Sequence, residues 1–297
     1  MLKVGTTFSG IGAPEQALKN LKIPHIVKWA CDIDKHAKQT YLANHVCEKW
    51  YDDITKIDIN NLEYVDLYVF GFPCQDISRI GLQDLGRGES ILVDYSLSII
   101  DKIHPKYILF ENVKNINSKR YKDFKDNILN RLAENYNIQY TIYNSLYFGV
   151  PQNRERFFCL GIRKDLNMQP NLPIQSLTQQ VKLYEVLDKN VDKSFYHIFP
   201  SMLRAVYESK RCPILDNNKF AYCLTTKQDR SPNSGLVNEN GKLRFLTPNE
   251  CRKLQGFPIN WIMPKSKYVA YKQFGNTITI NVLEKIFENL LQKDNES

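Results

Sequence analysis

The sequence predicts an α/β protein with a doubly wound, mostly parallel sheet and a second, smaller domain. Through about residue 166, short apolar runs rich in β-forming residues alternate with helical patterns, and this order is typical of the fold class. Glycine-rich or acidic segments follow the predicted strands, and ligands bind at that edge of such sheets. After Leu166 the alternation weakens, because prolines interrupt a segment rich in Lys, Asn, Ser and Tyr.

The predicted elements of the first domain follow one another with short connections. Apolar β-rich runs indicate the strands, amphipathic runs indicate the helices, and His104-Pro105 ends the helix before it. The predicted strands are Leu2–Phe8, Ile26–Cys31, Leu67–Phe70, Tyr107–Phe110, Gln139–Tyr147 and Arg156–Ile162. The predicted helices are Pro14–Leu21, Lys35–Asn44, Ser90–Ile103 and Tyr121–Tyr136.

Regular structure returns near the C-terminus. Apolar residues recur there at helical spacing, which predicts a helix over Asn276–Leu291 that packs on the first domain; they are Ile278, Val282, Ile286 and Leu290. We therefore assign residues 1–188 plus 263–297 to the main domain and residues 189–262 to the smaller, irregular one.

The composition excludes several classes of protein. Hydrophobic residues make up 43% and charged residues 24% of the 297 residues, as in soluble globular domains. No run of about 18 apolar residues is present and the N-terminus lacks a signal peptide, so we expect a cytoplasmic protein without a membrane span. The seven cysteines include no C-x-x-C pair, so we expect reduced thiols, with neither a disulfide framework nor a metal site.

The net charge of +8 favours a polyanionic partner such as nucleic acid, although a plain basic surface explains it equally well. Residues 163–244 contain 13 Lys or Arg and 8 Asp or Glu, a difference of +5. The middle of the chain therefore carries most of the excess.

Three segments at strand ends are candidates for binding a nucleoside. The glycine turn Phe8–Ala13 either lets a ligand approach the backbone or is an ordinary tight turn. Glu15 stands where a dinucleotide fingerprint needs its third glycine, which disfavours a nicotinamide oxidoreductase and favours an uncharged or cationic nucleoside. Asp32 is placed either to accept ribose hydroxyls or to cap a helix. Asp53-Ile54 is either an adenine contact or a solvated loop.

Three further segments contain groups suited to catalysis. Cys74 follows a buried strand in a loop that Pro73 restricts, and it is either a nucleophile or a structural thiol. Glu111 follows the next strand and is either an acid for a ring nitrogen or a loop carboxylate. Arg154 and Arg156 are two residues apart at a strand entrance, so they point to opposite faces, and the alternative for both is a surface strand.

The segments that contain these residues occur together in a fixed order: Phe8–Ala13, Gly71–Ser78, Glu111–Val113, Gln152–Arg156, Arg244–Pro258 and Tyr271–Leu283. This set resembles the DNA cytosine-5 methyltransferase family and covers nearly the whole chain except about residues 165–240. Two positions depart from the family pattern, since Ala13 replaces a frequent glycine and Ile77 a common aromatic residue.

The resemblance implies a fold and a cofactor. The fold would be the S-adenosylmethionine-dependent, Rossmann-like mixed sheet with one antiparallel strand, and residues 189–262 would form a target-recognition domain. The cofactor would be S-adenosylmethionine. The residues that would bind it are Phe8, Ser9, Gly10, Ile11, Gly12, Asp32, Ile33, Asp53, Ile54 and Asn276.

The resemblance also implies how cytosine would be methylated. Cys74 would attack C6 of a base flipped out of the duplex, and C5 would then take the methyl group. Glu111 would engage N3 and the exocyclic amine, and Arg156 the O2 side. Arg154 would support the site near Cys74.

The implied partner is double-stranded DNA, which a mobile lid and the smaller domain would bind. The expected DNA contacts are Gln75, Ser78, Arg79 and Arg87 around the lid, and Thr226, Lys227, Gln228 and Arg230 in the smaller domain. We expect a monomer, and a cognate restriction endonuclease would act on the same site without a stable complex.

Two other functions are disfavoured. An RNA cytosine-5 methyltransferase of the tRNA-acting branch would usually have a Pro-Pro-Cys loop and a Cys-Phe-Thr segment, and this chain has neither. A catalytically silent DNA-binding homologue is disfavoured because Cys74, Glu111 and Arg156 are all present.

Overall fold

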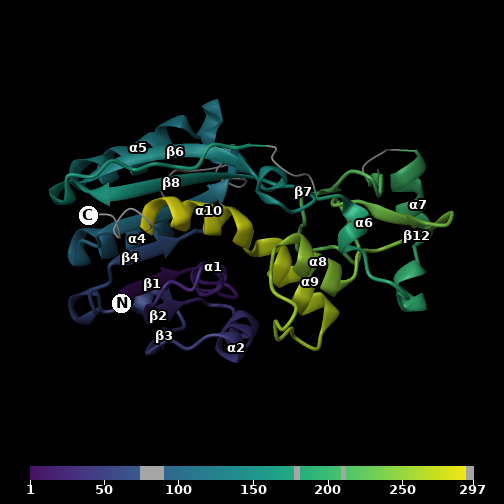
Figure 1. The fold of residues 1–297 in the computed structure, drawn as a ribbon, viewed down its shortest axis with the longest axis horizontal. Helices are drawn as coiled ribbons and strands as arrows, with labels where there is room; N and C mark the ends of the chain where they lie inside the picture. Colours follow the sequence, from purple (N-terminus) through teal and green to yellow (C-terminus); the bar gives the residue numbers. More distant parts are fainter. Residues whose placement is uncertain (74–89, 177–180, 209–211, 292–297) are drawn as a thin grey trace. The chain divides into compact units, whose positions relative to one another are not determined.

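The structure is a computed structural model that describes residues 1–73, 90–176, 181–208 and 212–291. The chain divides into two compact units (Figure 1). The first unit comprises Met1–Tyr143, Arg156–Ile174 and Glu284–Ser297, and the second comprises Asn144–Glu155 and Gln175–Leu283. The second unit is thus larger than the segment 189–262 that the sequence singles out. Among the described residues, no helix is both long enough and apolar enough to cross a bilayer.

The first unit is built on a mixed sheet with the strand order β3-β2-β1-β4-β5-β8-β6. Strands β1 to β5 pair in parallel, whereas β8 runs antiparallel to β5. The strand bounds are β1 Leu2–Thr7, β2 His25–Cys31, β3 Lys49–Tyr51, β4 Leu67–Phe70, β5 Tyr107–Val113, β6 Tyr136–Asn144 and β8 Glu155–Arg163. The predicted α/β class is therefore confirmed, including its antiparallel strand.

Helices and short 3-10 turns connect these strands. The helices are α1 Ala13–Asn20, α2 Lys35–Asn44, α4 Ser90–Ile103, α5 Lys122–Asn135 and α10 Ile280–Leu291. The 3-10 turns of this unit are η1 Ile54–Lys56, η2 Ile59–Asn61, η3 Lys114–Asn117, η4 Lys119–Tyr121 and η6 Lys164–Leu166, whereas η5 Ser145–Phe148 and η7 Lys193–Tyr196 belong to the second unit. Residues of α4 and α5 share one hydrophobic core cluster with the sheet, so these two helices cover the same face.

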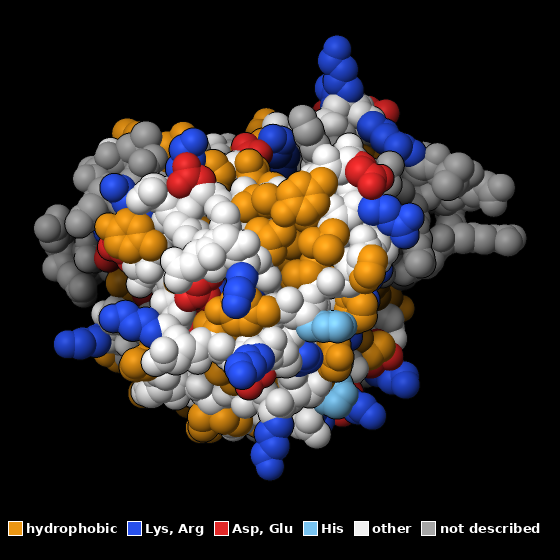
Figure 2. Space-filling view, turned by 90° about the vertical axis from the view of Figure 1, so that its right-hand side faces the viewer, with side chains coloured by type: hydrophobic (Ala, Val, Ile, Leu, Met, Phe, Trp, Pro, Cys, Tyr) orange, Lys and Arg blue, Asp and Glu red, His pale blue; other side chains and the backbone are white. Residues whose placement is uncertain are grey.

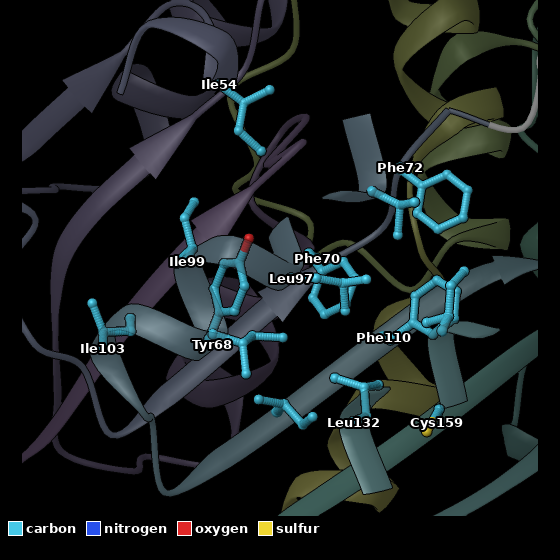
Figure 3. Close-up of a cluster of buried hydrophobic side chains, with 14 of the residues drawn as sticks. Ile54, Tyr68, Phe70, Phe72, Leu97, Ile99, Ile103, Phe110, Leu132 and Cys159 are labelled. Atoms are coloured by element: carbon cyan, nitrogen blue, oxygen red, sulfur yellow. The ribbon is translucent and has the colours of Figure 1, made fainter. Parts of the chain in front are cut away.

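Aromatic rings from neighbouring strands form the centre of this cluster (Figure 3). Phe70 of β4 stacks on Tyr68 at 5.2 Å and on Phe110 of β5 at 5.1 Å between ring centroids. Phe72 stacks on the other side of Phe110 at 5.4 Å. Because buried aromatic pairs are strongly held, the chain that leaves β4 toward Pro73 is fixed to the strand that carries Glu111.

The second unit consists of short elements joined by irregular chain. Its strands are β7 Gln152–Asn153, β9 Ile214–Leu215, β10 Ala221–Tyr222, β11 Leu236–Glu239 and β12 Lys242–Arg244. Its helices are α6 Leu183–Val186, α7 Pro200–Tyr207, α8 Pro248–Leu254 and α9 Lys267–Asn276. A small apolar cluster that includes Met202, Val206 and Leu236 lies between α7 and β11.

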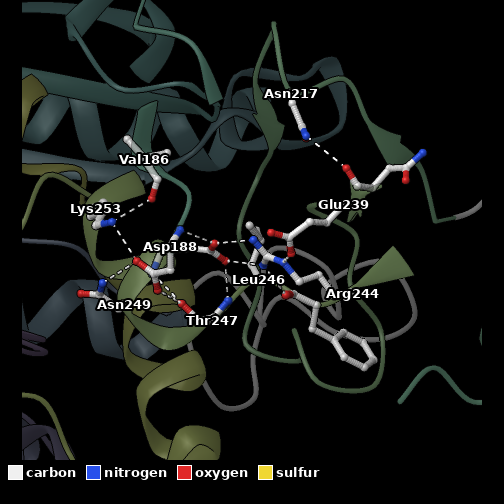
Figure 4. A network of polar contacts seen from close by, with 12 residues as sticks. Val186, Asp188, Asn217, Glu239, Arg244, Leu246, Thr247, Asn249 and Lys253 are labelled. Atoms are coloured by element: carbon white, nitrogen blue, oxygen red, sulfur yellow. Dashed lines mark hydrogen bonds and ion pairs between the residues drawn. The ribbon is translucent and has the colours of Figure 1, made fainter. Parts of the chain in front are cut away.

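A network of buried charges holds this unit together (Figure 4). Arg244 makes two hydrogen bonds to the carboxylate of Glu250, at 2.8 and 3.0 Å. Glu250 also accepts the backbone N–H groups of Thr247 and Asp188. Lys253 in turn binds Asp188 at 2.8 Å. Because this unit has few regular helices and strands, the polar network fixes the positions of its irregular segments.

Several element boundaries differ from the prediction. Strand β5 extends to Val113 because it pairs with β8 over its whole length, so Glu111 lies within the strand and not after it. Strand β6 begins and ends three residues earlier than predicted. The last helix begins at Ile280 and not at Asn276, because Asn276 is the last residue of α9 and Thr277 after it has an extended backbone.

Candidate active site

The glycine turn after β1 adopts a backbone that exposes it to a ligand. Phe8, Gly10 and Gly12 have positive φ angles of 54°, 55° and 84°, a region that favours glycine and is strained for Phe8. Where a Cβ of Gly10 would stand, the nearest atom is the Phe8 carbonyl at 4.0 Å, so this side of the turn is open. A Cβ on Gly12 would instead collide with the His45 ring at 2.4 Å. The turn therefore has one open and one packed side.

The side chains of Ser9 and Ile11 support this turn from inside the protein. Ser9 Oγ lies 3.1 Å from the Cys31 carbonyl and accepts the Cys31 N–H at 3.0 Å, which joins the ends of β1 and β2. Ile11 is buried in the core. Any ligand contact by Ser9 or Ile11 would therefore be made through the backbone.

Asp32 lies beside the turn, and it does not cap the helix that follows. Asp32 accepts the N–H of Gly10 at 2.7 Å and that of Asp34 at 2.8 Å. Asp34, not Asp32, is the N-cap of α2, because it accepts the N–H groups of His36 and Ala37. Each carboxylate oxygen has a second lone pair, so Asp32 can still accept ribose hydroxyls. Next to it, Ile33 is 80% exposed, as an apolar contact for a base requires.

Asp53 and Ile54 both have contacts within the protein itself. Asp53 caps η1 by accepting the N–H and hydroxyl of Thr55, at 2.9 and 2.8 Å. These hydrogen bonds lower the pKa of the Asp53 carboxyl. Ile54 is buried in the core cluster of Figure 3. The structure thus shows a packing role for Ile54, and its expected adenine contact stays a prediction.

Glu111 and Arg156 are brought together by the antiparallel pairing of β5 and β8. Val113 is the partner of Arg156 in this register, so Glu111 and Arg156 lie diagonally on the same face. Arg156 Nε is 3.3 Å from Glu111 Oε1, with side chains 17% and 13% exposed. A half-buried pair of this kind offers both a carboxylate and a cation to one bound ring.

The same carboxylate borders the chain that leads to Cys74. A Cβ on Gly71 would stand 3.1 Å from Glu111 Oε2, so a larger residue there would require the Glu111 side chain to shift by a few tenths of an ångström. Asn112 also anchors the segment that leads to Cys74, because its Nδ2 donates to the Phe72 carbonyl at 3.2 Å. No signal in the sequence indicates this role. The predicted residues beyond this segment, Cys74, Gln75, Ser78, Arg79 and Arg87, lie outside the described residues.

Arg154 is a buried residue of the second unit. It is 2% exposed, and its guanidinium donates to the carbonyls of Leu224, Gly275 and Thr277 at 3.0, 3.1 and 2.8 Å. A guanidinium has five donors, and here they hold loop carbonyls in place. Its expected support of the site near Cys74 stays a prediction, because Cys74 lies outside the described residues. Asn276, an expected cofactor contact, is the exposed last residue of α9 in this same unit.

Of the four residues in the second unit that were expected to contact DNA, only some have exposed side chains. Gln228 is 1% exposed and donates to the Thr225 carbonyl at 3.0 Å, so its amide braces the loop and does not reach a base edge. Lys227 and Arg230 are exposed, and Thr226 is half-buried. Arg230 forms an ion pair with Asp229 at 3.0 Å. On the face drawn in Figure 2, lysine and arginine side chains are scattered around apolar patches and do not form a single stripe.

A hollow of about 570 Å³ in the first unit lies at the wrong edge of the sheet for this chemistry. Leu2, Asp66 and Tyr107 line it, at the amino ends of β1, β4 and β5. The glycine turn, Asp32 and Gly71 follow the carboxyl ends of their strands, where doubly wound sheets bind ligands.

Glu15 supports the glycine turn from the protein interior, a role that the sequence did not reveal. Its Oε1 accepts from Thr6 Oγ1 at 3.0 Å and from the Tyr41 hydroxyl at 2.8 Å, while Thr6 Oγ1 also lies 2.7 Å from Ser9 Oγ. Glu15 Oε2 is buried without a hydrogen-bond partner among the described residues. Burial raises the pKa of this carboxyl, which favours its neutral form.

Replacing Glu15 by glutamine is expected to remove a pH-dependent part of the stability. The unfolded chain ionises this carboxyl with the ordinary pKa of 4.5, whereas the folded pKa is raised. The stabilising contribution is therefore complete below the unfolded pKa and is lost as pH rises through the folded pKa. The free energy of unfolding of the parent, minus that of Glu15→Gln, should therefore fall as pH rises above 4.5.

Urea unfolding at a series of pH values measures this difference. Both proteins carry His45, whose pKa burial lowers to about 4, so its own pH dependence cancels in the difference. Glu63→Gln, at an exposed carboxylate, is the matched control. A parent-minus-variant difference for Glu15→Gln that stays constant with pH would contradict a neutral, buried Glu15.

The strand order, with its antiparallel β8, and the glycine turn followed by Asp32 define the class of this protein as an S-adenosylmethionine-dependent methyltransferase of the Rossmann-like type. Comparison with families narrows the class. The sequence model of the C-5 cytosine-specific DNA methylases matches residues 2–292. The chain belongs to this family and is a DNA cytosine-5-methyltransferase, with S-adenosylmethionine as its methyl donor.

Individual relatives agree with this assignment. The chain is 31% identical to the Type II methyltransferase M.Bsp6I of Bacillus sp. (strain RFL6), over 98% of either protein. It is 34% identical to the Type II methyltransferase M2.ScrFI of Lactococcus lactis subsp. cremoris, over 93% of this chain and 81% of the relative. The S. pombe Dnmt2 methyltransferase has the same fold, with a TM-score of 0.82 and 22% identity over 99% of this chain and 100% of that one.

Proposed function

We propose that this enzyme methylates cytosine within a specific sequence of double-stranded DNA, with Cys74 as the nucleophile. The proposal depends on one observation, which is how closely the Glu111 carboxylate approaches Gly71. A Cβ built on Gly71 would lie 3.1 Å from Glu111 Oε2. Gly71 precedes Cys74 by three residues. The acid on β5 and the chain that leads to the thiol therefore share one edge of the sheet.

Four of the other six cysteines support the choice of Cys74, because they are buried. Burial raises the pKa of Cys31 and of Cys159 to about 12, and that of Cys212 to about 11. The pKa of the fully buried Cys251 is raised as well. A nucleophile must reach the thiolate form, so these four thiols are suited to packing.

The Glu111–Arg156 pair accounts for how the ring would be activated. Cytosine C6 is a poor electrophile unless the charge that develops on the ring is neutralised. Glu111 would hold N3 and the exocyclic amine, while Arg156 would bind O2 and keep Glu111 oriented through their 3.3 Å contact. Bound S-adenosylmethionine supplies the methyl group for C5. Loss of the C5 proton and elimination of Cys74 then restore the aromatic ring.

The residues of the glycine turn and Asp32 fit a nucleoside of this kind. The open side of Gly10 allows close approach, Asp32 offers a carboxylate beside it, and Ile33 presents an exposed apolar surface. We assign Phe8, Gly10, Gly12, Asp32 and Ile33 to the cofactor site on this basis. The expected contributions of Asp53 and Asn276 stay predictions.

The wider biological setting is also a proposal. The relatives' names as Type II methyltransferases favour a role beside a restriction endonuclease that acts on the same sequence. We infer that target recognition lies in the second unit, with Lys227 and Arg230 among its exposed residues. We further propose that the enzyme works as a monomer in the cytoplasm.

Covalent trapping tests this proposal. Bisulfite sequencing of DNA from a host that expresses the chain identifies the methylated sequence. A duplex with 5-fluorocytosine at that position should then form an adduct that survives denaturation, because fluorine cannot leave C5 as a proton does. Mass spectrometry should place the adduct on the peptide that contains Cys74. The same duplex with cytosine is the control, and an adduct on another cysteine would contradict the proposal.

A further inference from the structure

A basic segment follows directly on the strand that carries Glu111. Residues 114–122 contain four basic and no acidic residues, all four with exposed side chains, and we refer to these four as the basic ledge: Lys114, Lys119, Arg120 and Lys122. They lie on η3, on η4 and at the start of α5. The ledge therefore begins at the carboxyl end of β5, the same edge of the sheet as the Glu111–Arg156 pair.

Two buried side chains fix the backbone of the ledge. Ile116 is fully buried and Tyr121 nearly so, and both belong to the core cluster that contains Phe72 and Phe110. Lys125 Nζ also binds Asn117 Oδ1 at 2.9 Å. Because apolar residues anchor both turns, the basic side chains project from a rigid base at a set position relative to Glu111.

The charges of the ledge are only partly neutralised by the protein itself. Lys122 pairs with Asp126 at 2.8 Å. Lys119 and Arg120 are adjacent, and in the part of the chain that the structure describes no carboxylate lies within 4.0 Å of either. Other cations of the same unit do have such partners, among them the half-buried Lys38 with Asp52 and Arg163 with Asp165, both at 2.7 Å.

We propose that Lys119 and Arg120 bind phosphates of the DNA backbone beside the target base. Two adjacent cations on a rigid turn repel one another, and a polyanion relieves that repulsion and releases counterions on binding. Phosphate contacts of this kind position a duplex without reading its sequence. The inference rests on the proposed action on double-stranded DNA, and it assigns part of the DNA-binding surface to the catalytic unit itself.

The salt dependence of DNA binding tests the ledge. In Lys119→Gln/Arg120→Gln, the slope of log Kd against log salt should fall by about two, because each phosphate contact contributes about 0.9. At about 0.1 M salt, Kd for a fluorescent duplex should rise about ten-fold. Turnover at saturating DNA and the affinity for S-adenosylmethionine should be unchanged, because both residues lie outside the proposed catalytic and cofactor sites.

A charge-matched control separates a specific contact from a general loss of charge. Lys19→Gln/Lys22→Gln removes two exposed cations of the same unit, and Lys22 lies beside the hollow at the opposite edge of the sheet. This control should have the same salt slope as the parent. The variant Lys119→Arg/Arg120→Lys, which keeps both positive charges, should also have the parental slope. An equal fall in slope for both glutamine pairs, or no fall for the ledge pair, would overturn the inference.

The outcome does not depend on the chemistry of Cys74. Binding is measured without methyl transfer, so a failure to trap an adduct would leave the salt slope interpretable. Conversely, an enzyme that forms the adduct on Cys74 but shows an unchanged slope in the ledge variant would keep the proposed function and lose only this inference.

Discussion

Replacing Cys74 by alanine is expected to lower methyl transfer by at least about a thousand-fold, because the proposed mechanism uses this thiol to form the covalent bond to C6. DNA binding should persist, since a thiol that attacks the base contributes little to phosphate contacts. Transfer of a tritiated methyl group to DNA measures the first quantity, and fluorescence anisotropy with a labelled duplex measures the second. The combination distinguishes a lost nucleophile from an unfolded protein.

The chain offers a matched control for this substitution. Cys47 is a half-buried thiol in the loop after α2, and burial raises its pKa. Cys47→Ala should keep full activity, because that cysteine lies outside the edge formed by Gly71 and Glu111. Measurable turnover by Cys74→Ala at a rate near that of Cys47→Ala would exclude the covalent mechanism, whatever the family resemblance implies.

The sheet and the order of the site residues were predictable because they depend on local pattern. Short apolar runs such as Leu67–Phe70 are typical of buried strands, and an acid at the end of the second strand falls at a fixed edge of the sheet. The pairing of Glu111 with Arg156 was harder to foresee. It depends on the register of an antiparallel strand, which a single sequence does not specify.

Other side chains have contacts distant in sequence that the chain alone does not reveal. Gln228 was expected to contact DNA, yet it is buried and binds a backbone carbonyl. Arg154 is likewise buried on backbone carbonyls, and Ile54, next to a possible cofactor acid, packs into the core. A long polar side chain can satisfy either solvent or a loop, and sequence alone does not reveal which. The same ambiguity hid Glu15, whose carboxyl supports the turn from inside.

Replacing Glu250 by alanine is expected to destabilise the second unit by about 3 to 5 kcal/mol, the usual cost of leaving one member of a buried ion pair alone. The side chains of Arg244 and Glu250 are 1% and 0% exposed, and the pair is joined by two hydrogen bonds. Loss of the carboxylate would also remove the acceptor for the N–H groups of Thr247 and Asp188. Urea unfolding and hydrogen exchange of the amides in α8 would report this loss.

Glu239→Gln is the matched control, because Glu239 binds the same arginine at 2.8 Å but is 36% exposed. Its loss should cost about 1 kcal/mol or less, as for other partly exposed ion pairs. The double variant Arg244→Met/Glu250→Leu should recover much of the stability lost in Glu250→Ala, since replacing both members removes the isolated charge. If Glu250→Ala and Glu239→Gln cost the same, the buried network would not be what orders this unit, and its few short strands and the Met202–Leu236 cluster would have to carry the stability alone.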